Sequence, residues 1–207
     1  MHEFWQQFMV GMRETTPPEY IAVFAGIASV WLSRQENILL YPVGLINTVI
    51  YIYLSVDRHL FGEASVNLYY TIVSIYGWII WSRKNERHQP VLRITMSNRK
   101  EWIQQLLFFS VFYIAIFCAL TYLQKAFDVT TIPVMDAFAS ATAYTGMWLM
   151  ARKKVESWYW WIATNVASIP LYFIKGLSFT SVYYFILLLL AIFGLKEWKK
   201  KSLENRA

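Results

Sequence analysis

The sequence predicts an all-α integral membrane protein, with seven transmembrane helices in a 3+1+3 parallel-repeat arrangement after an N-terminal amphipathic helix. Three observations lead to this fold class: an apolar composition, seven stretches long enough to cross a bilayer, and a weak internal repeat. Of the 207 residues, 57% are hydrophobic and 15% are charged, and the mean hydropathy is +0.35. Because a span needs roughly 20 apolar residues, we expect no separate soluble domain.

The first segment, residues 1–16, predicts an interfacial amphipathic helix. Phe4, Phe8 and Met12 are spaced at i, i+4 and i+8, while the stretch is too short and too polar to cross a membrane. The proline pair at 17–18 ends it. A frayed tail is the alternative interpretation.

Seven apolar stretches follow, and each predicts a transmembrane helix. They cover residues 19–33, 37–56, 64–82, 102–124, 132–151, 157–174 and 177–195. They are grouped into a first three-helix repeat (17–84), a basic cytoplasmic loop with a linking helix (85–128), a second three-helix repeat (129–199) and a cytoplasmic tail (200–207).

Basic residues are distributed unevenly between the two sides of these spans. Of the 19 Lys and Arg residues, only Arg13, Arg58, Lys125 and Lys175 fall on one side, and the other 15 fall on the opposite side. The positive-inside rule therefore predicts an outside N-terminus and an inside C-terminus, which requires an odd number of spans. The net charge of +6 then reflects basic cytoplasmic loops rather than nucleic-acid binding.

The two halves of the chain share a weak repeat with an offset of about 117 to 120 residues. The matched features are Gly77 and Trp81 with Gly194 and Trp198, the tyrosine pairs 69–70 and 183–184, Trp31 with Trp148, and Glu36 with Glu156. An odd span between the halves makes corresponding helices run in the same direction. The repeat is therefore predicted to be parallel, with a pathway between the two triplets.

Polar and aromatic residues share one face of several spans, where hydrocarbon offers them no partners. These residues are Trp158, Trp161, Asn165, Ser168 and Tyr172 on the sixth span, Asn67, Tyr70 and Trp78 on the third, and Asn47 and Tyr51 on the second. Three such faces predict a substrate cavity. The alternative is that the Asn and Ser side chains pack helices together while Trp and Tyr anchor the chain at the interface.

The chemistry of these faces indicates the class of solute. Indole and phenol rings stack on a heteroaromatic ring and attract a ring cation, and amide groups bind hydroxyl and carboxamide groups. Because no Lys or Arg lies within a span, a nucleoside or vitamin is favoured over a nucleotide. Asp136, near the outer end of the fifth span, is the one carboxylate within the apolar runs apart from their terminal turns. A helix-start charge is its expected role, so passive transport is favoured over ion coupling.

The sequence offers little for catalysis or cofactor binding. The histidines at positions 2, 59 and 88 lie outside the spans with no metal-ligand or nucleophile–base spacing. Cys118 is the single cysteine, and no phosphate-binding or dinucleotide-binding glycine motif occurs. We therefore expect no enzyme, no catalytic residues, no metal site and no cofactor. A membrane enzyme and a non-transporting scaffold remain the alternatives from other classes.

Three runs of residues together resemble the PnuC family of bacterial vitamin transporters. They are Trp31 to Gly44, Asn67 to Trp81 with its Tyr-Gly-Trp motif, and Trp158 to Tyr172 with Trp161 and Asn165. The resemblance covers roughly residues 20–198. It implies a 3+1+3 arrangement similar to that of SWEET sugar transporters, in the bacterial cytoplasmic (inner) membrane.

The resemblance also implies facilitated diffusion of nicotinamide riboside, which a cytoplasmic kinase then traps by phosphorylation. It implies that Trp161 and Asn165 contact the substrate; Asn67, Tyr70 and Asn47 extend this set by helical facing. A homotrimer surrounded by membrane lipid is a further implication. Relatives that carry thiamine or riboflavin look alike at this level, so both vitamins stay as alternative substrates.

Overall fold

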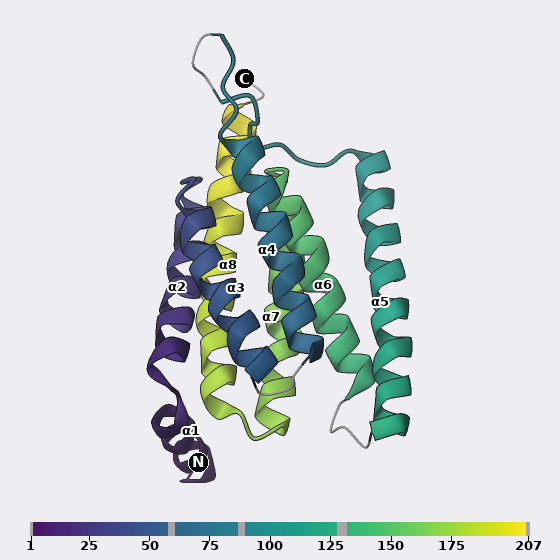
Figure 1. The fold of residues 1–207 in the computed structure, drawn as a ribbon. Helices are drawn as coiled ribbons and strands as arrows, with labels where there is room; N and C mark the ends of the chain where they lie inside the picture. The colour runs from purple at the N-terminus through teal and green to yellow at the C-terminus, as the bar shows by residue number, and fades with distance from the viewer. Residues whose placement is uncertain (1, 58–60, 87–89, 128–131, 206–207) are drawn as a thin grey trace.

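The computed structural model describes residues 2–57, 61–86, 90–127 and 132–205. Within these ranges the chain is helical, with two isolated bridges and no strand (Figure 1). The helices are α1 (His2–Glu14), α2 (Pro17–Arg34), α3 (Leu40–Asp57), α4 (Phe61–Trp81), α5 (Arg99–Phe127), α6 (Pro133–Ala151), α7 (Ser157–Ile174) and α8 (Ser178–Glu204). Each of the eight predicted helices therefore corresponds to one observed helix. The predicted domain boundary at 128/129, and Arg58, Arg87, Arg206 and the histidines at 59 and 88, lie outside the described residues.

Three of the described helices, α3, α5 and α8, are long and apolar enough to cross a membrane by length and composition. The other four predicted spans, α2, α4, α6 and α7, have 18 to 21 residues each. They fall short because polar and aromatic side chains lower their mean hydropathy. Helix α7, for example, contains three Trp and two Tyr residues besides Asn165 and Ser168.

Six helices form a closed ring. In each half the middle helix contacts its two neighbours: α3 packs on α2 and α4, and α7 packs on α6 and α8. The halves meet along two seams, α2 with α8 and α4 with α6. Helix α5 packs along α6 outside this ring, and α1 packs against α8 (Figure 1).

Helices α2 and α6 run in the same direction, and the two termini lie at opposite ends of the bundle (Figure 1). We call the end that holds the C-terminus the basic end, because the basic segments 83–86, 90–100, 152–154 and 196–201 lie there. At the opposite end α6 starts at Pro133, and the Asp136 carboxylate accepts a hydrogen bond from the Ile132 N–H at 2.8 Å. Asp136 also lies 2.6 Å from Lys175 Nζ. As expected from sequence, this acid serves a helix start.

The structure fixes the register of the repeat at 117 residues. Glu36 and Lys153 are the only non-glycine residues with positive φ in the described part of the chain (64° and 53°), and they are 117 positions apart. The same separation relates Gly77 to Gly194 and Trp81 to Trp198. Two sequence matches are therefore out of register: the tyrosine pairs differ by 114 positions, and Glu156 lies one turn beyond the counterpart of Glu36.

Candidate substrate site and its closed end

One face of α7 carries the five residues that the sequence places on the sixth span. Trp158, Asn165 and Ser168 are only 1 to 2% exposed, while Trp161 and Tyr172 are half-buried. Spacings of three and four residues keep these side chains on one side of the helix. Their contacts, described next, are with α4, α6 and α8, so this face points into the ring.

Trp161 is held between two helices. A Cβ atom at Gly146 on α6 would lie 3.3 Å from three atoms of the indole, so glycine is the residue that lets the ring approach this closely. The ring centroid of Trp161 also lies 6.4 Å from that of Tyr70 on α4, and Tyr70 lies 6.1 Å from Tyr144 in an edge-on arrangement. Residues from both halves of the chain therefore form one aromatic cluster.

Asn165 lies one turn further along α7 and is 2% exposed. Its Oδ1 atom is buried, and none of the described residues donates a hydrogen bond to it. Its neighbour Thr164, by contrast, donates to Trp160 C=O and Thr142 Oγ1 at 2.9 Å. A buried acceptor without a donor costs free energy, so the Oδ1 atom of Asn165 is a vacant hydrogen-bond acceptor inside the ring.

A second aromatic cluster lies towards the end opposite the basic end. Tyr172 stacks on Tyr184 of α8 with ring centroids 5.1 Å apart, and Tyr184 meets Tyr183 edge-on at 5.6 Å. Tyr183 closely approaches Gly26 of α2, beside Asn47. Because Asn165 and Ser168 lie between Trp161 and Tyr172 on α7, the buried polar atoms are flanked by aromatic rings on both sides.

Besides Tyr70 and Trp78, the residues predicted on the second and third spans are Asn47, Tyr51 and Asn67. Asn47 Nδ2 donates a 2.7 Å hydrogen bond to Ala22 C=O, so this side chain ties α3 to α2, as the packing alternative proposes. Tyr51 and Asn67 are half-buried, and the backbone carbonyl of Asn67 accepts from Thr71 at 2.9 Å.

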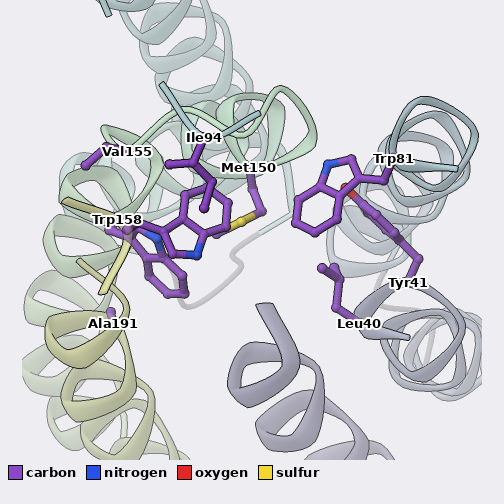
Figure 2. Packing of buried hydrophobic residues seen from close by; sticks show 9 residues of the cluster. Leu40, Tyr41, Trp81, Ile94, Met150, Val155, Trp158 and Ala191 are labelled. Atoms are coloured by element: carbon purple, nitrogen blue, oxygen red, sulfur yellow. The ribbon is translucent and has the colours of Figure 1, made fainter. Parts of the chain in front are cut away.

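Two predicted residues lie away from both clusters. Trp158 belongs to the hydrophobic core at the basic end (Figure 2). Its ring is edge-on to that of Trp198, with centroids 5.5 Å apart, and lies tight against Gly194. Trp78 is 39% exposed, and no ring contact joins it to Tyr70 or another described residue. The site therefore spans a shorter part of α7 and α4 than the predicted faces do.

Several residues of these clusters were not predicted as site residues. In the sequence Tyr183 and Tyr184 are marks of the repeat, while Tyr144 and Gly146 fall in a stretch of α6 made of small residues. The cue was present for the tyrosine pair, because two adjacent tyrosines in an apolar run need polar or aromatic partners. For Gly146 the sequence held no cue, since only the approach of the indole explains it.

The two halves are bonded to each other at the basic end by exchanged tryptophans. Trp81 at the end of α4 donates from Nε1 to Ala151 C=O at the end of α6, at 3.0 Å. Trp198 on α8 donates to Ser33 C=O and Arg34 C=O at the end of α2, at 3.1 and 3.2 Å. Because Arg34 and Ala151 are 117 positions apart, the two bonds are equivalent in the repeat.

Side chains close the same end. Lys153 Nζ lies 2.7 Å from Glu36 Oε1 and 4.4 Å from the centroid of the Trp81 ring, and its side chain is 5% exposed. Lys201 lies 3.5 Å from the other Glu36 oxygen. Figure 2 shows Met150 between the two groups of core aromatics, where Ser33 Oγ contacts its sulfur at 2.9 Å.

A buried polar chain ties α5 and the segment before it to α7. Glu156 is 1% exposed and accepts from Ser97 N–H at 2.9 Å and Ser97 Oγ at 2.8 Å. Gln105 donates to Ser97 Oγ at 2.7 Å and accepts from Trp160 Nε1 at 3.1 Å. The buried carboxylate is thus hydrogen-bonded, as such groups must be.

An ion pair on the surface adds to this tether. Lys154 Nζ lies 2.7 Å from Glu101 Oε1. Partial burial opposes ionisation of Glu101, but hydrogen bonds from Lys154 and the Asn98 N–H, with the charges of Lys154 and Arg152, outweigh it and lower the pKa of this carboxyl. The stabilisation is present at neutral pH and is lost as the pH falls through the lowered pKa.

The fold and the site together define a membrane transporter for a small solute: a ring of six helices, aromatic and amide groups inside it, and one end closed by bonds between related halves. In the part of the chain that the structure describes, no three His, Cys, Asp or Glu residues cluster as metal ligands. The family described as nicotinamide mononucleotide transporter matches residues 16–200, and the chain belongs to this family, which is the PnuC family indicated by the motifs. The protein is therefore a transporter and not an enzyme.

Individual relatives agree with this assignment. The chain is 25% identical to the nicotinamide riboside transporter PnuC of Escherichia coli, over 90% of this chain and 87% of that protein. It is 24% identical to the riboflavin/roseoflavin transporter RibM of Streptomyces davaonensis, over 86% of this chain and 82% of that protein. A crystal structure of the vitamin B3 transporter PnuC has the same fold, with a TM-score of 0.72 and 21% identity over 98% of this chain and 89% of that chain.

Proposed function

We propose that the protein carries nicotinamide riboside across the membrane by facilitated diffusion. The observation that carries this proposal is the vacant, buried Oδ1 of Asn165 one turn from the Trp161 indole. Nicotinamide riboside has a flat cationic ring for an indole face, and its carboxamide and ribose hydroxyls supply hydrogen-bond donors for the amide oxygen. The name of the Escherichia coli relative supports this substrate.

A phosphorylated substrate fits the site poorly. The nearest cations along the clusters are already engaged, as Lys175 is with Asp136 at 2.6 Å, and no Lys or Arg lies among the rings around Trp161. A desolvated phosphate would therefore lack a counter-charge. For this reason we assign the riboside rather than the mononucleotide.

Nicotinamide riboside should bind saturably, and riboflavin and thiamine should bind at least about tenfold more weakly. The three-ring flavin is larger than a pyridinium and carries no ring charge, while thiamine is an aromatic cation without ribose hydroxyls. Calorimetry of the purified protein with the three vitamins measures this order. Tighter binding of riboflavin, as the RibM relative would suggest, or of thiamine would reassign the substrate, and absence of any saturable binding would favour a scaffold.

The membrane arrangement that we propose has seven spans, α2 to α8, in a 3+1+3 parallel repeat similar to SWEET transporters. The repeats are residues 17–84 and 129–199, the linking unit is 85–128, and α1 within residues 1–16 lies in the interface. Support comes from the ring of two equivalent triplets and from α5 outside it. A homotrimer is proposed from the family resemblance alone, and light scattering on the purified protein tests it.

Reporter fusions at both termini should place the N-terminus outside and the C-terminus in the cytoplasm of a bacterial inner membrane. The reason is the concentration of 15 of the 19 Lys and Arg residues on one side of the spans. Alkaline phosphatase, which is active in the periplasm, and green fluorescent protein, which is active in the cytoplasm, provide the two readouts. Phosphatase activity from the C-terminal fusion would invert the arrangement.

Uptake into empty liposomes should stop at equal concentrations inside and outside, with the solute chemically unchanged. Asp136, in the first turn of α6, is already paired with Lys175, which leaves no evident site for a coupling ion. In the cell a cytoplasmic kinase would then draw uptake forward by phosphorylating the product, without having to contact the transporter. Because the solute is a cation, the membrane potential must be clamped. Accumulation against the gradient under that clamp would contradict uncoupled transport.

A further inference from the structure

The two turns at the basic end, one after α2 and one after α6, have the same backbone. Both turn through a residue with positive φ, Glu36 in the first and Lys153 in the second. Their hydrogen bonds also correspond at a separation of 117 residues. In the first turn the N–H groups of Glu36, Asn37 and Leu40 donate to the carbonyls of Ser33 (3.0 Å), Leu32 (2.9 Å) and Asn37 (3.1 Å). In the second turn the N–H groups of Lys153, Lys154 and Ser157 donate to the carbonyls of Met150 (3.0 Å), Leu149 (3.0 Å) and Lys154 (3.1 Å).

The outer edge of the second turn is occupied by an extended segment of the same chain. Thr95 N–H donates to Lys153 C=O, and Val155 N–H donates to Thr95 C=O, both at 3.1 Å. This is a short parallel pairing, and it seats the adjacent Ile94 side chain, 0% exposed, in the core cluster with Val155 and Trp198. A segment of extended peptide therefore completes this turn by main-chain pairing.

The outer edge of the first turn is open. Its equivalent groups are Glu36 C=O and Ile38 N–H, and neither has a hydrogen-bond partner among the residues that the structure describes. They border a groove of about 570 Å³ that is lined by Ile38 and Trp81. These two residues are the repeat equivalents of Val155 and Trp198, which contact Ile94 at the second turn. The groove lining also includes Lys84 and Lys153. We call the outer edge of each turn, where an extended segment can pair, a seat. The seat at the second turn is filled by residues of this chain, and the seat at the first turn is vacant.

We propose that this groove binds an extended, acidic peptide segment of another protein by pairing with the main chain of the first turn. The segment would donate an N–H to Glu36 C=O and accept from Ile38 N–H, as Thr95 does in the second turn. An apolar β-branched side chain of the peptide would lie against Ile38 and Trp81, in the place that Ile94 takes in the other seat.

Charge determines which peptide fits. Of the two lysines in the groove lining, Lys153 is paired with Glu36 at 2.7 Å, and Lys84 adds the net positive charge that attracts acidic residues. The counterpart of Glu156, which binds Ser97 in the filled seat, is Leu39 in the open one, and Leu39 is 54% exposed. The peptide should therefore carry an apolar residue where the internal segment carries serine.

A designed probe tests the proposal with the intact protein. It is a fluorescent peptide with the sequence of residues 92–97, changed at Arg93→Glu and Ser97→Leu and preceded by two glutamates. Fluorescence anisotropy should give saturable binding. N-methylation of the peptide threonine, which removes the N–H that Glu36 C=O would accept, should weaken binding about tenfold, and Lys84→Glu in the protein should weaken it at least as much. Lys100→Glu, an exposed basic site on α5, is the matched control and should leave affinity unchanged.

Hydrogen exchange provides a readout that does not depend on variants. In the free protein the fragment containing Val155 should be protected and the fragment containing Ile38 should exchange faster, and the probe should slow exchange only in the latter. Equal protection of the two fragments without probe would mean that the chain itself fills the groove, which overturns the proposal. So would binding that is indifferent to N-methylation and to Lys84→Glu, or that leaves the Ile38 fragment unprotected.

Discussion

Alanine in place of Trp161 should weaken nicotinamide riboside binding by about 1–3 kcal/mol, roughly five- to 150-fold in Kd. The indole lies against Gly146 and near Tyr70, and its removal would take away both contact area and ring–cation attraction. Phenylalanine should cost less. Calorimetry measures Kd, and Trp160→Phe is a matched control because the Trp160 indole points away to Gln105 on α5.

A variant of Asn165, one turn along α7 from Trp161, distinguishes a role in binding from a role in packing more sharply. Asn165→Leu should weaken binding by a similar order, because a polar group of the solute would be left unpaired in a dry site. The same change removes a buried oxygen that has no donor among the described residues, so it should not lower the melting temperature of the free protein. A lower melting temperature with unchanged affinity in both variants would assign Trp161 and Asn165 to helix packing.

Breaking the ion pair at the basic end should have the other large effect. Glu36→Gln should lower the free energy of unfolding by about 1–3 kcal/mol, because Lys153, 5% exposed at its side chain, would be left buried without a counter-charge. The effect is below that of a fully buried pair because the Glu36 side chain is 26% exposed. Denaturant unfolding in detergent measures it.

A double-mutant cycle isolates the pair. Lys153→Met should also destabilise, since it removes the contact with the Trp81 ring as well as the charge. The double variant Glu36→Gln with Lys153→Met should lose less than the sum of the two single variants, because neither then leaves an unpaired charge. Strict additivity would show that the 2.7 Å contact contributes nothing to stability.

Much of the fold is readable in the sequence because bilayer-length apolar runs and helical spacing are local signals. The face of α7 with Trp161, Asn165 and Ser168 follows directly from its spacing. The register of the repeat is harder to predict, because tyrosines or acids can be matched one turn away from their true equivalents. Both the tyrosine pairs and the Glu36–Glu156 match differ in this way from the separation of 117 residues. The positive φ values of Glu36 and Lys153 identify the register, and backbone angles of non-glycine residues are not visible in a sequence.

Contacts with backbone carbonyls account for most of what the sequence could not provide. Asn47 is a predicted solute contact and Trp198 a mark of the repeat, yet each donates to a backbone carbonyl on α2, and backbone carbonyls leave no trace in the sequence. Similarly, Trp158 shares the stripe of Asn165 but lies far enough along α7 to enter the core at the basic end. Helical spacing predicts which side of a helix a residue faces, but not which level of the bundle it occupies along the helix axis.

The exchanged tryptophan bonds are symmetric between the two halves of the chain. Bonds from Trp81 to the end of α6 and from Trp198 to the end of α2 are those that a two-fold dimer of identical three-helix chains would form, since each copy offers the same donor and acceptor. The contact between Glu36 and Lys153 is different, because these positions are equivalent and face each other. Identical subunits would place like charges there. Opposite charges at these equivalent positions therefore require two halves with different sequences, whereas the tryptophan bonds beside them do not.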